Sequence, residues 1–128
     1  MPLLEKIRDA AESGFLEELL KRVEGEKSFC RVLASYLGAE SEAVLNGVEA
    51  DLYDGLEAAE VKLYPKRFYE GFGQALALKV IGGVEKPLLL HVVWSADPLY
   101  LENLKKMGAA AGVKVAVYVR GGPLYEYG

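Results

Sequence analysis

Hydrophobic residues recur along the first third of the chain at the spacing of helices. In residues 3–23 the apolar side chains follow a helical period, with Ser13-Gly14 as a candidate kink. A second run begins near Glu26 and ends at Gly38, a residue type that terminates helices in the left-handed conformation. The pattern therefore predicts two N-terminal helices.

The next segment, GVEADLYDGLEAAEVKLY at residues 47–64, alternates as two strands of a hairpin. Asp54-Gly55 is a favoured two-residue loop, and with that loop Tyr53 pairs with Leu56. Paired residues point to the same side of a sheet, so four charged side chains share one face: Glu49, Asp51, Glu60 and Lys62. The other face collects residues suited to a core: Ala50, Leu52, Ala59, Val61 and Leu63. This assignment of faces holds for a loop of two or four residues.

The second half of the chain alternates helices and strands. Residues 66–81 predict a helix, and the apolar run KPLLLHVVWS at 86–95 predicts a buried strand. A helix at 97–111 and a strand at 113–120 follow, and a strand-helix-strand unit implies a right-handed crossover with parallel strands. We therefore expect an α/β fold with a central mixed sheet of about four strands, flanked by helices. The tail GGPLYEYG has no helix signal and could cover an edge strand, pack on a partner or fray.

Composition limits the classes of function. The chain has 128 residues, of which 52% are hydrophobic, and this is enough for one domain over residues 1–128 with a real core. With a formal net charge of -4, no global field attracts nucleic acid or anionic membrane, so a bound polyanion needs a local basic patch. The apolar runs are too short to span a membrane, no signal peptide is evident, and we expect a cytoplasmic protein. The absence of Thr and the abundance of Glu, Lys and Tyr are typical of a thermophile.

Four further residues are tempting but have plain structural readings. The single Cys30 has no partner for a disulfide or a zinc site, and we expect it to be a small buried residue. His91 lies in an apolar strand, where a hydrogen-bonded core or edge histidine is the simplest interpretation. Trp94 and Tyr118, at strand positions, are expected in the core.

The charged face of the hairpin is unusual because two of its acids, Asp51 and Glu60, are expected diagonally across the strands with Cβ atoms about 5 to 8 Å apart. Like charges at that distance destabilise each other unless a cation or a proton compensates them. Oxygen ligands on a rigid strand pair suit Mg²⁺ or Mn²⁺, with waters and a substrate phosphate completing the coordination. Lys62, on the same face, is placed to hold a water or to stabilise charge on a phosphate.

These residues also carry a family resemblance. The pair AD at 50–51, followed by EVK at 60–62, resembles the signature of the PD-(D/E)XK nuclease superfamily, which includes archaeal Holliday junction resolvases, RecB-type nucleases and many restriction endonucleases. The resemblance implies a restriction-endonuclease-like core and Mg²⁺-dependent hydrolysis of phosphodiester bonds. It implies that Asp51 and Glu60 bind the metal, that Val61 adds its backbone carbonyl, and that Lys62 is the catalytic lysine.

The resemblance extends to two more residues. YEGFGQALAL at residues 69–78 resembles the glutamine-bearing helix of RecB-like members, which implies an assisting role for Gln74, the only Gln in the chain. Resolvase-like members open a helix with a glutamate upstream of the aspartate, and Glu26 occupies the corresponding place. An acid there could equally serve only the helix dipole, and Gln74 could be a solvated or core amide.

A nuclease must also hold a polyanion. Lys66 and Arg67 lie at the start of the helix expected after the EVK strand, whose N-terminus itself attracts phosphate. We therefore expect them to contact nucleic acid. Binding by a single copy would be weak, and the resolvase-like relatives suggest a homodimer. A second possible basic stripe comprises Lys86, Lys105, Lys106, Lys114 and Arg120.

Two functions from different classes remain open at this point. The first is a metal-dependent nuclease acting on DNA, on branched or recombination and repair intermediates, with RNA cleavage by the same site as a weaker variant. The second is a non-catalytic module that keeps the nuclease-like fold as a subunit or a sensor of DNA structure. The acidic net charge and the small size of the chain favour the second.

Overall fold

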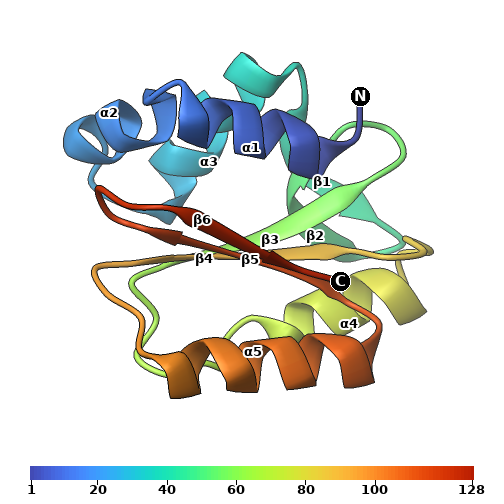
Figure 1. Cartoon of the computed structure of the whole chain (residues 1–128). Coiled ribbons are helices and arrows are strands. Elements are labelled where there is room, and N and C mark those ends of the chain that lie inside the picture. The colour runs from blue at the N-terminus through green and yellow to red at the C-terminus, as the bar shows by residue number, and fades with distance from the viewer.

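The computed structural model describes all residues, 1–128, and consists of one β-sheet covered on both faces by helices (Figure 1). Three helices come first: α1 (Leu3–Glu12), α2 (Phe15–Arg22) and α3 (Glu26–Leu37). A three-strand meander follows: β1 (Glu40–Leu45), β2 (Val48–Tyr53) and β3 (Ala58–Leu63). The remaining elements are α4 (Phe72–Val80), β4 (Leu88–Val93), α5 (Pro98–Ala111), β5 (Lys114–Val119) and β6 (Leu124–Tyr127).

The sheet has six strands in the order β1-β2-β3-β4-β5-β6. Its centre, β3 to β5, is parallel, whereas β1, β2 and β6 are antiparallel to their neighbours. Helices α1, α2 and α3 cover one face, and α4 and α5 cover the other (Figure 1). The α/β class and the mixed sheet agree with expectation, but the expected restriction-endonuclease-like core with a sheet of about four strands is wrong, because the sheet has six.

The two strands that the sequence pattern missed lie at the two edges of the sheet. β1 joins β2 through Asn46 and Gly47, both in the left-handed region, with φ of 52° and 85°. Asn-Gly is the strongest short hairpin signal, so this turn could have been recognised. β6, which lies in the tail GGPLYEYG, pairs with β5 and so covers an edge strand.

The hairpin of β2 and β3 has a longer loop than expected. Tyr53 lies opposite Ala58, not Leu56, so the loop has four residues, 54–57. The Asp54 carboxylate accepts the backbone N–H groups of Leu56 at 2.9 Å and Glu57 at 2.6 Å, and thereby stabilises the wider turn. The register differs by two residues from the predicted one, an even number, so the side of the sheet to which each β3 residue points is unchanged.

Glycines in the left-handed region set two helix boundaries that the pattern placed elsewhere. Gly14, with φ of 86°, divides the expected helix at 3–23 into α1 and α2. Gly71, with φ of 92°, makes α4 begin at Phe72 instead of at residue 66. The segment between β3 and α4, residues 64–71, is therefore a loop.

The core has a layer on each face of the sheet. The larger one packs β3, β4 and β5 against the N-terminal helices, with Phe29, Leu33 and Val61 fully buried. The other packs α4 and α5 on the opposite face, around Leu89 and Leu104. None of the helices has the length and apolar character needed to cross a membrane.

Candidate metal and catalytic site

Strands β2 and β3 separate after two residue pairs, and carboxylates take over the hydrogen bonds of the missing ladder. The last pair is Leu52 with Ala59. Beyond it, Asp51 Oδ2 accepts the backbone N–H of Val61 at 2.8 Å. Glu26 Oε1, from the first residue of α3, accepts the backbone N–H of Leu63 at 2.9 Å. The structure thus brings two of the predicted acids to the free edge of β3.

The alternation of side chains along β2 is interrupted at Asp51. Leu52 packs in the core layer under the N-terminal helices, whereas Ala50 packs with Leu78 and Val84 on the side of α4. The prediction that Ala50 and Leu52 share one face is therefore wrong. The pairing of β1 with β2 also skips Asp51, opposite Glu42, whose φ is 56°. This irregularity turns the Asp51 carboxylate into the gap beside β3.

Glu60 lies next to this gap in an unfavourable environment for a charge. Its residue is only 4% exposed, and its Oε1 atom is buried without a hydrogen-bond partner. Burial, followed by the charge of Asp51 and a hydrogen bond with it, raises the pKa of Glu60 to about 9, and Lys62 opposes this shift. A carboxyl group in this state is protonated at neutral pH unless a cation compensates it.

The buried thiol of Cys30 lies among the core residues of α3. Burial raises the pKa of Cys30, and the negative charges of Asp51, Glu26 and Glu60 raise it further. Cys30 is 3% exposed, which confirms that it is a core residue.

Lys62 follows Glu60 on the same side of β3, and its position depends on a glycine. A Cβ atom at Gly71 would lie 3.2 Å from Cγ of Lys62 and 2.5 Å from Cδ1 of Leu89. The aliphatic part of Lys62 therefore passes over the backbone of Gly71, at the start of α4. Its ammonium group makes no hydrogen bond or ion pair within the chain, so its donors are free for a water or a substrate.

His91, the neighbour of Lys62 on β4, fixes the loop that follows the site. The ring is fully buried, with Nε2 at 2.7 Å from the carbonyl oxygen of Glu70 and Nδ1 at 2.7 Å from the hydroxyl of Tyr100. A carbonyl only accepts, so Nε2 carries the proton and Nδ1 accepts from the tyrosine. Burial, the largest cause, lowers the pKa of His91, which stays neutral. The expectation of a hydrogen-bonded core histidine is confirmed.

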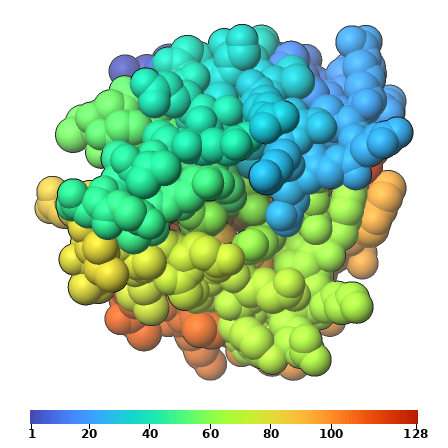
Figure 2. Space-filling view, turned by 180° about the vertical axis from the view of Figure 1, so that it is seen from behind, coloured from blue at the N-terminus to red at the C-terminus, as the bar shows by residue number.

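The predicted nucleic-acid contacts lie on the loop that His91 anchors. Lys66 and Arg67 are exposed, and the backbone N–H of Arg67 donates to Oε2 of Glu70 at 2.7 Å. They lie on the loop before α4, not in its first turn as expected. Figure 2 shows this side of the molecule, where the light-green residues of the loop and yellow α4 border green β1 and β2 and cyan α3.

Gln74 makes no hydrogen bond to the carboxylates. It lies in the first turn of α4 and is exposed. The side of α4 that faces the sheet carries Phe72, Ala75 and Leu78. The hydrogen bonds of the chain therefore tie Asp51 and Glu26 to β3 and leave Gln74 without a partner.

The gap between β2 and β3 offers oxygen atoms that could coordinate a hard divalent cation. The structure contains no group of three or more His, Cys, Asp or Glu side chains arranged to hold a metal ion. It offers two carboxylates, Asp51 and Glu60, and the carbonyl of Val61, which points to the same edge of β3 as the Val61 N–H. Mg²⁺ binds through one or two carboxylates while keeping several waters, so this set fits it. The unpartnered Oε1 of Glu60 is the atom that such a cation would satisfy.

One aromatic cluster was not anticipated. Trp94, expected in the core, is 65% exposed because it follows the last residue of β4. Its indole stacks on Tyr64, with ring centroids 5.0 Å apart, and carries the Arg120 guanidinium at 4.5 Å. Tyr118 is buried, as expected.

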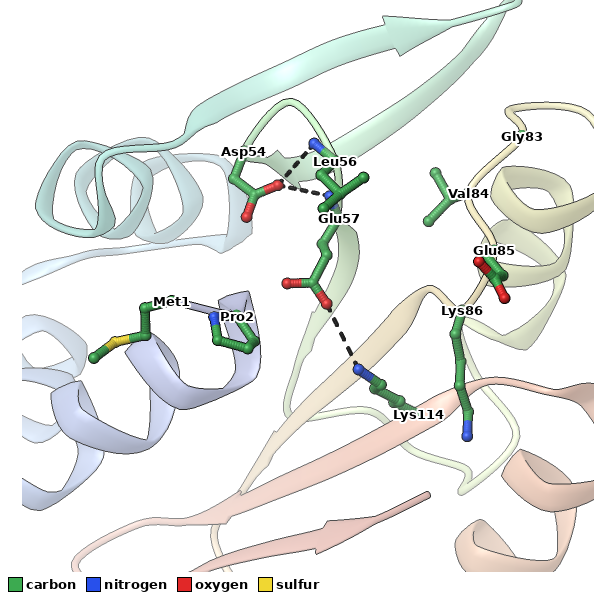
Figure 3. Close-up of a pocket in the computed structure, with 10 residues that line it drawn as sticks. All are labelled: Met1, Pro2, Asp54, Leu56, Glu57, Gly83, Val84, Glu85, Lys86 and Lys114. Atoms are coloured by element: carbon green, nitrogen blue, oxygen red, sulfur yellow. Dashed lines mark hydrogen bonds and ion pairs between the residues drawn. The ribbon is translucent and has the colours of Figure 1, made fainter.

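A hollow of about 680 Å³ lies at the opposite end of the sheet from Lys62 and Glu26, where the parallel strands begin (Figure 3). The Asp54 carboxylate binds the N–H groups of its own loop, whereas Glu57 reaches Lys114 at the start of β5 and forms an ion pair with it at 3.5 Å. Glu57 and Lys114 are paired with each other, so neither is a free catalytic group comparable to Lys62.

No family model matches the chain, and comparisons with curated proteins and with solved structures find no similar protein.

Proposed function

We propose that this protein is a metal-dependent nuclease that hydrolyses DNA phosphodiester bonds, on branched or recombination and repair intermediates. The observation that carries the proposal is the gap between β2 and β3, where Asp51 lies beside a buried oxygen of Glu60 that has no partner. A structural role alone would favour an apolar or amide side chain at position 60, since a buried polar atom without a partner costs about 1–3 kcal/mol. A divalent cation would satisfy this oxygen and balance both charges.

Each residue of the site has a role that follows from its position. Asp51, Glu60 and the Val61 carbonyl would hold Mg²⁺ or Mn²⁺ at the free edge of β3. When bound, such a cation polarises a phosphate and lowers the pKa of water. Lys62 orients the attacking water or stabilises the negative charge that develops on the phosphate, because its donors are otherwise unused.

Glu26 supports this centre from the helical side. One of its oxygens holds the N–H of Leu63 and so fixes the end of β3 against α3. The other makes no hydrogen bond within the chain and can accept one from a water. Glu26 is thus a positioning residue for the strand that carries Lys62, and its free oxygen is a candidate for an assisting group.

The substrate backbone would be held by the loop between β3 and α4. Lys66 and Arg67 are exposed there, directly after the strand that carries Lys62. Because the net charge of the chain is -4, these contacts must act locally and their strength should fall with salt.

A homodimer would double these contacts, and an apolar surface supports it. Leu76, Val80 and Ile81 on the outer side of α4 are 38%, 76% and 55% exposed. Asn46, in the turn after β1, donates to the Ile81 carbonyl at 3.0 Å, so β1 borders this surface and adds the exposed Val44. Sedimentation of the wild type and of Val80→Glu would test this: the proposal expects a dimer that the glutamate converts to a monomer.

The direct test of the nuclease is cleavage of labelled single-stranded, duplex, flap and four-way-junction DNA in Mg²⁺ or Mn²⁺. The sharpest variant is Lys62→Met, which keeps the aliphatic packing over Gly71 and removes the charge. Lys21→Met, an exposed lysine on α2, is the matched control. Cleavage that requires the metal, is lost in Lys62→Met and persists in Lys21→Met supports the proposal. Folded wild type without cleavage of any substrate in either metal contradicts it.

A non-catalytic module that binds DNA structure is the second candidate, and the burial of Glu60 favours it. With only 4% of its surface exposed and a raised pKa, Glu60 can remain a neutral, protonated core residue. Such a protein would bind branched DNA equally well with Mn²⁺, without Mn²⁺ and as Glu60→Gln. A nuclease, in contrast, should lose cleavage when Mn²⁺ is removed and when Glu60 is replaced by Gln.

A further inference from the structure

The cluster of Tyr64, Trp94 and Arg120 lies where the parallel strands β3, β4 and β5 end. Tyr64 follows β3 directly, Trp94 follows β4 and Arg120 follows β5. The carboxyl ends of parallel strands meet at one edge of a sheet, where ligands of α/β proteins commonly bind. Trp94 is the only tryptophan in the chain. Its side chain is 65% exposed at this edge, so it does not serve to fill the core.

One face of the Trp94 indole is covered and the other is open. Tyr64 stacks on the indole with planes 11° apart, and Arg120 lies over the same ring system with Cζ 4.5 Å from the centroid. Nη1 of Arg120 donates to the Tyr64 hydroxyl at 2.6 Å. Groups on opposite faces of an indole each stand about 3.5 Å from its plane, and about 7 Å from each other, so these two groups share one face. The other face is left to solvent, in agreement with the exposure.

The covered face is held by a dense set of hydrogen bonds. Glu17 of α2 accepts from Arg120 Nη2 at 2.8 Å, from Arg120 Nε, from the Tyr118 hydroxyl at 2.9 Å and from the Gly121 N–H at 2.8 Å. The Arg120 side chain is only 11% exposed. The support under Trp94 is therefore fixed before any ligand arrives, and its acid and base neutralise each other.

The cluster of Tyr64, Trp94 and Arg120 adjoins the candidate site. Tyr64 and Glu26 line a common hollow of about 220 Å³ between β3 and the turn before α3. Lys66 and Arg67 follow Tyr64 by two and three residues. A strand of nucleic acid that leaves Lys62 past Glu26 thus reaches Tyr64 and then Trp94, with cations alongside for its phosphates.

We propose that the open face of Trp94 is a stacking platform for an unpaired nucleobase of the substrate, so the protein engages DNA with single-stranded or unstacked bases. The proposal deepens the proposed function and rests on it for the choice of DNA. A flat aromatic surface binds any base through its π face, whereas paired bases inside a duplex cannot reach it. The neighbouring cations supply the sequence-independent attraction of the backbone.

The test uses the fluorescence of Trp94, because it reports on this surface alone. The full chain is titrated in EDTA with a short oligothymidylate and with a blunt duplex of equal charge. If a base stacks on the indole, the single strand should quench the Trp94 fluorescence and the duplex should not. The two are compared at equal occupancy, which is measured by the anisotropy of a labelled strand. Quenching by both, or by neither while the strand binds, overturns the proposal.

Variants separate stacking from catalysis. Trp94→Ala removes an exposed side chain, and its affinity for the single strand should fall roughly 5- to 100-fold with duplex binding unchanged. Leu56→Ala, an exposed apolar residue at the other end of the sheet, is the matched control and should bind as the wild type. Equal affinity of Trp94→Ala and wild type contradicts the platform. Lys62→Met should keep the quenching and lose cleavage. Wild type that shows the quenching but cleaves no substrate in Mg²⁺ or Mn²⁺ rejects the nuclease and leaves the platform standing.

Discussion

The most informative single change is Glu60→Gln, studied in the absence of metal. In the folded protein the pKa of Glu60 is about 9, whereas the ordinary value is 4.5. Between these values the folded state holds one more proton than the unfolded state, so the free energy of unfolding must decrease as pH rises. Glutamine has nearly the same shape and stays neutral, so it removes this dependence and leaves the packing in place.

The expected magnitude follows from linkage. One proton changes the free energy of unfolding by about 1.4 kcal/mol per pH unit. From about pH 5 to about pH 8 the wild type should therefore lose about 4 kcal/mol relative to Glu60→Gln, which becomes the more stable protein. The slope reflects the one extra proton that the folded state holds in this pH range, so it is the quantity to measure.

Urea unfolding in EDTA at several pH values measures this difference. Groups elsewhere titrate equally in both proteins and cancel. Glu85→Gln is the control, because Glu85 is exposed and its side chain makes no hydrogen bond or ion pair; its difference from wild type should stay within about 0.5 kcal/mol. A Glu60→Gln difference that is also independent of pH would refute the claim that Glu60 is buried against Asp51.

Two further changes test the surroundings of Lys62. Gly71→Ala should destabilise the fold by about 1–3 kcal/mol in thermal unfolding, because φ is 92° and the new methyl group meets the Lys62 side chain. Gly73→Ala, which has open space around it in α4, should stabilise the fold by about 0.5–1 kcal/mol. Equal effects of the two substitutions would contradict this. His91→Phe should lower the free energy of unfolding by about 2–4 kcal/mol, because two buried hydrogen bonds are lost. Because folding lowers the pKa of His91, the wild type should lose its advantage over His91→Phe as pH falls below about 6.5. Nitrogen shifts of a cationic His91 at neutral pH would show this to be wrong.

Side-chain parity predicts the arrangement within one strand. Glu60 and Lys62, two residues apart, share a face of β3 whatever the register with β2. Glu26 is implied by the resemblance to resolvase-like members, and the structure places its carboxylate on the Leu63 N–H. The first relation depends on local geometry, which the sequence carries.

The sequence could not give the features that depend on tertiary context. The break in alternation at Asp51 arises from the irregular pairing with β1, a strand that the pattern missed. Trp94 continues an apolar run that is typical of a buried strand. It is exposed because β4 ends one residue earlier, at Val93. The pattern predicts the helix that carries Gln74 from residue 66, whereas Gly71 in the left-handed conformation makes α4 begin at Phe72.

The proposed nuclease depends most directly on a divalent cation between Asp51 and Glu60, and a Mn²⁺ titration followed by electron paramagnetic resonance measures its binding. Wild type should bind one Mn²⁺ per chain, and Glu60→Gln should lose it. Asp51→Asn, which can still accept the Val61 N–H, should bind at least tenfold more weakly, and Lys62→Met should bind as the wild type. A folded wild type that binds no Mn²⁺ above pH 9, or binds it equally well as Glu60→Gln, would contradict the account.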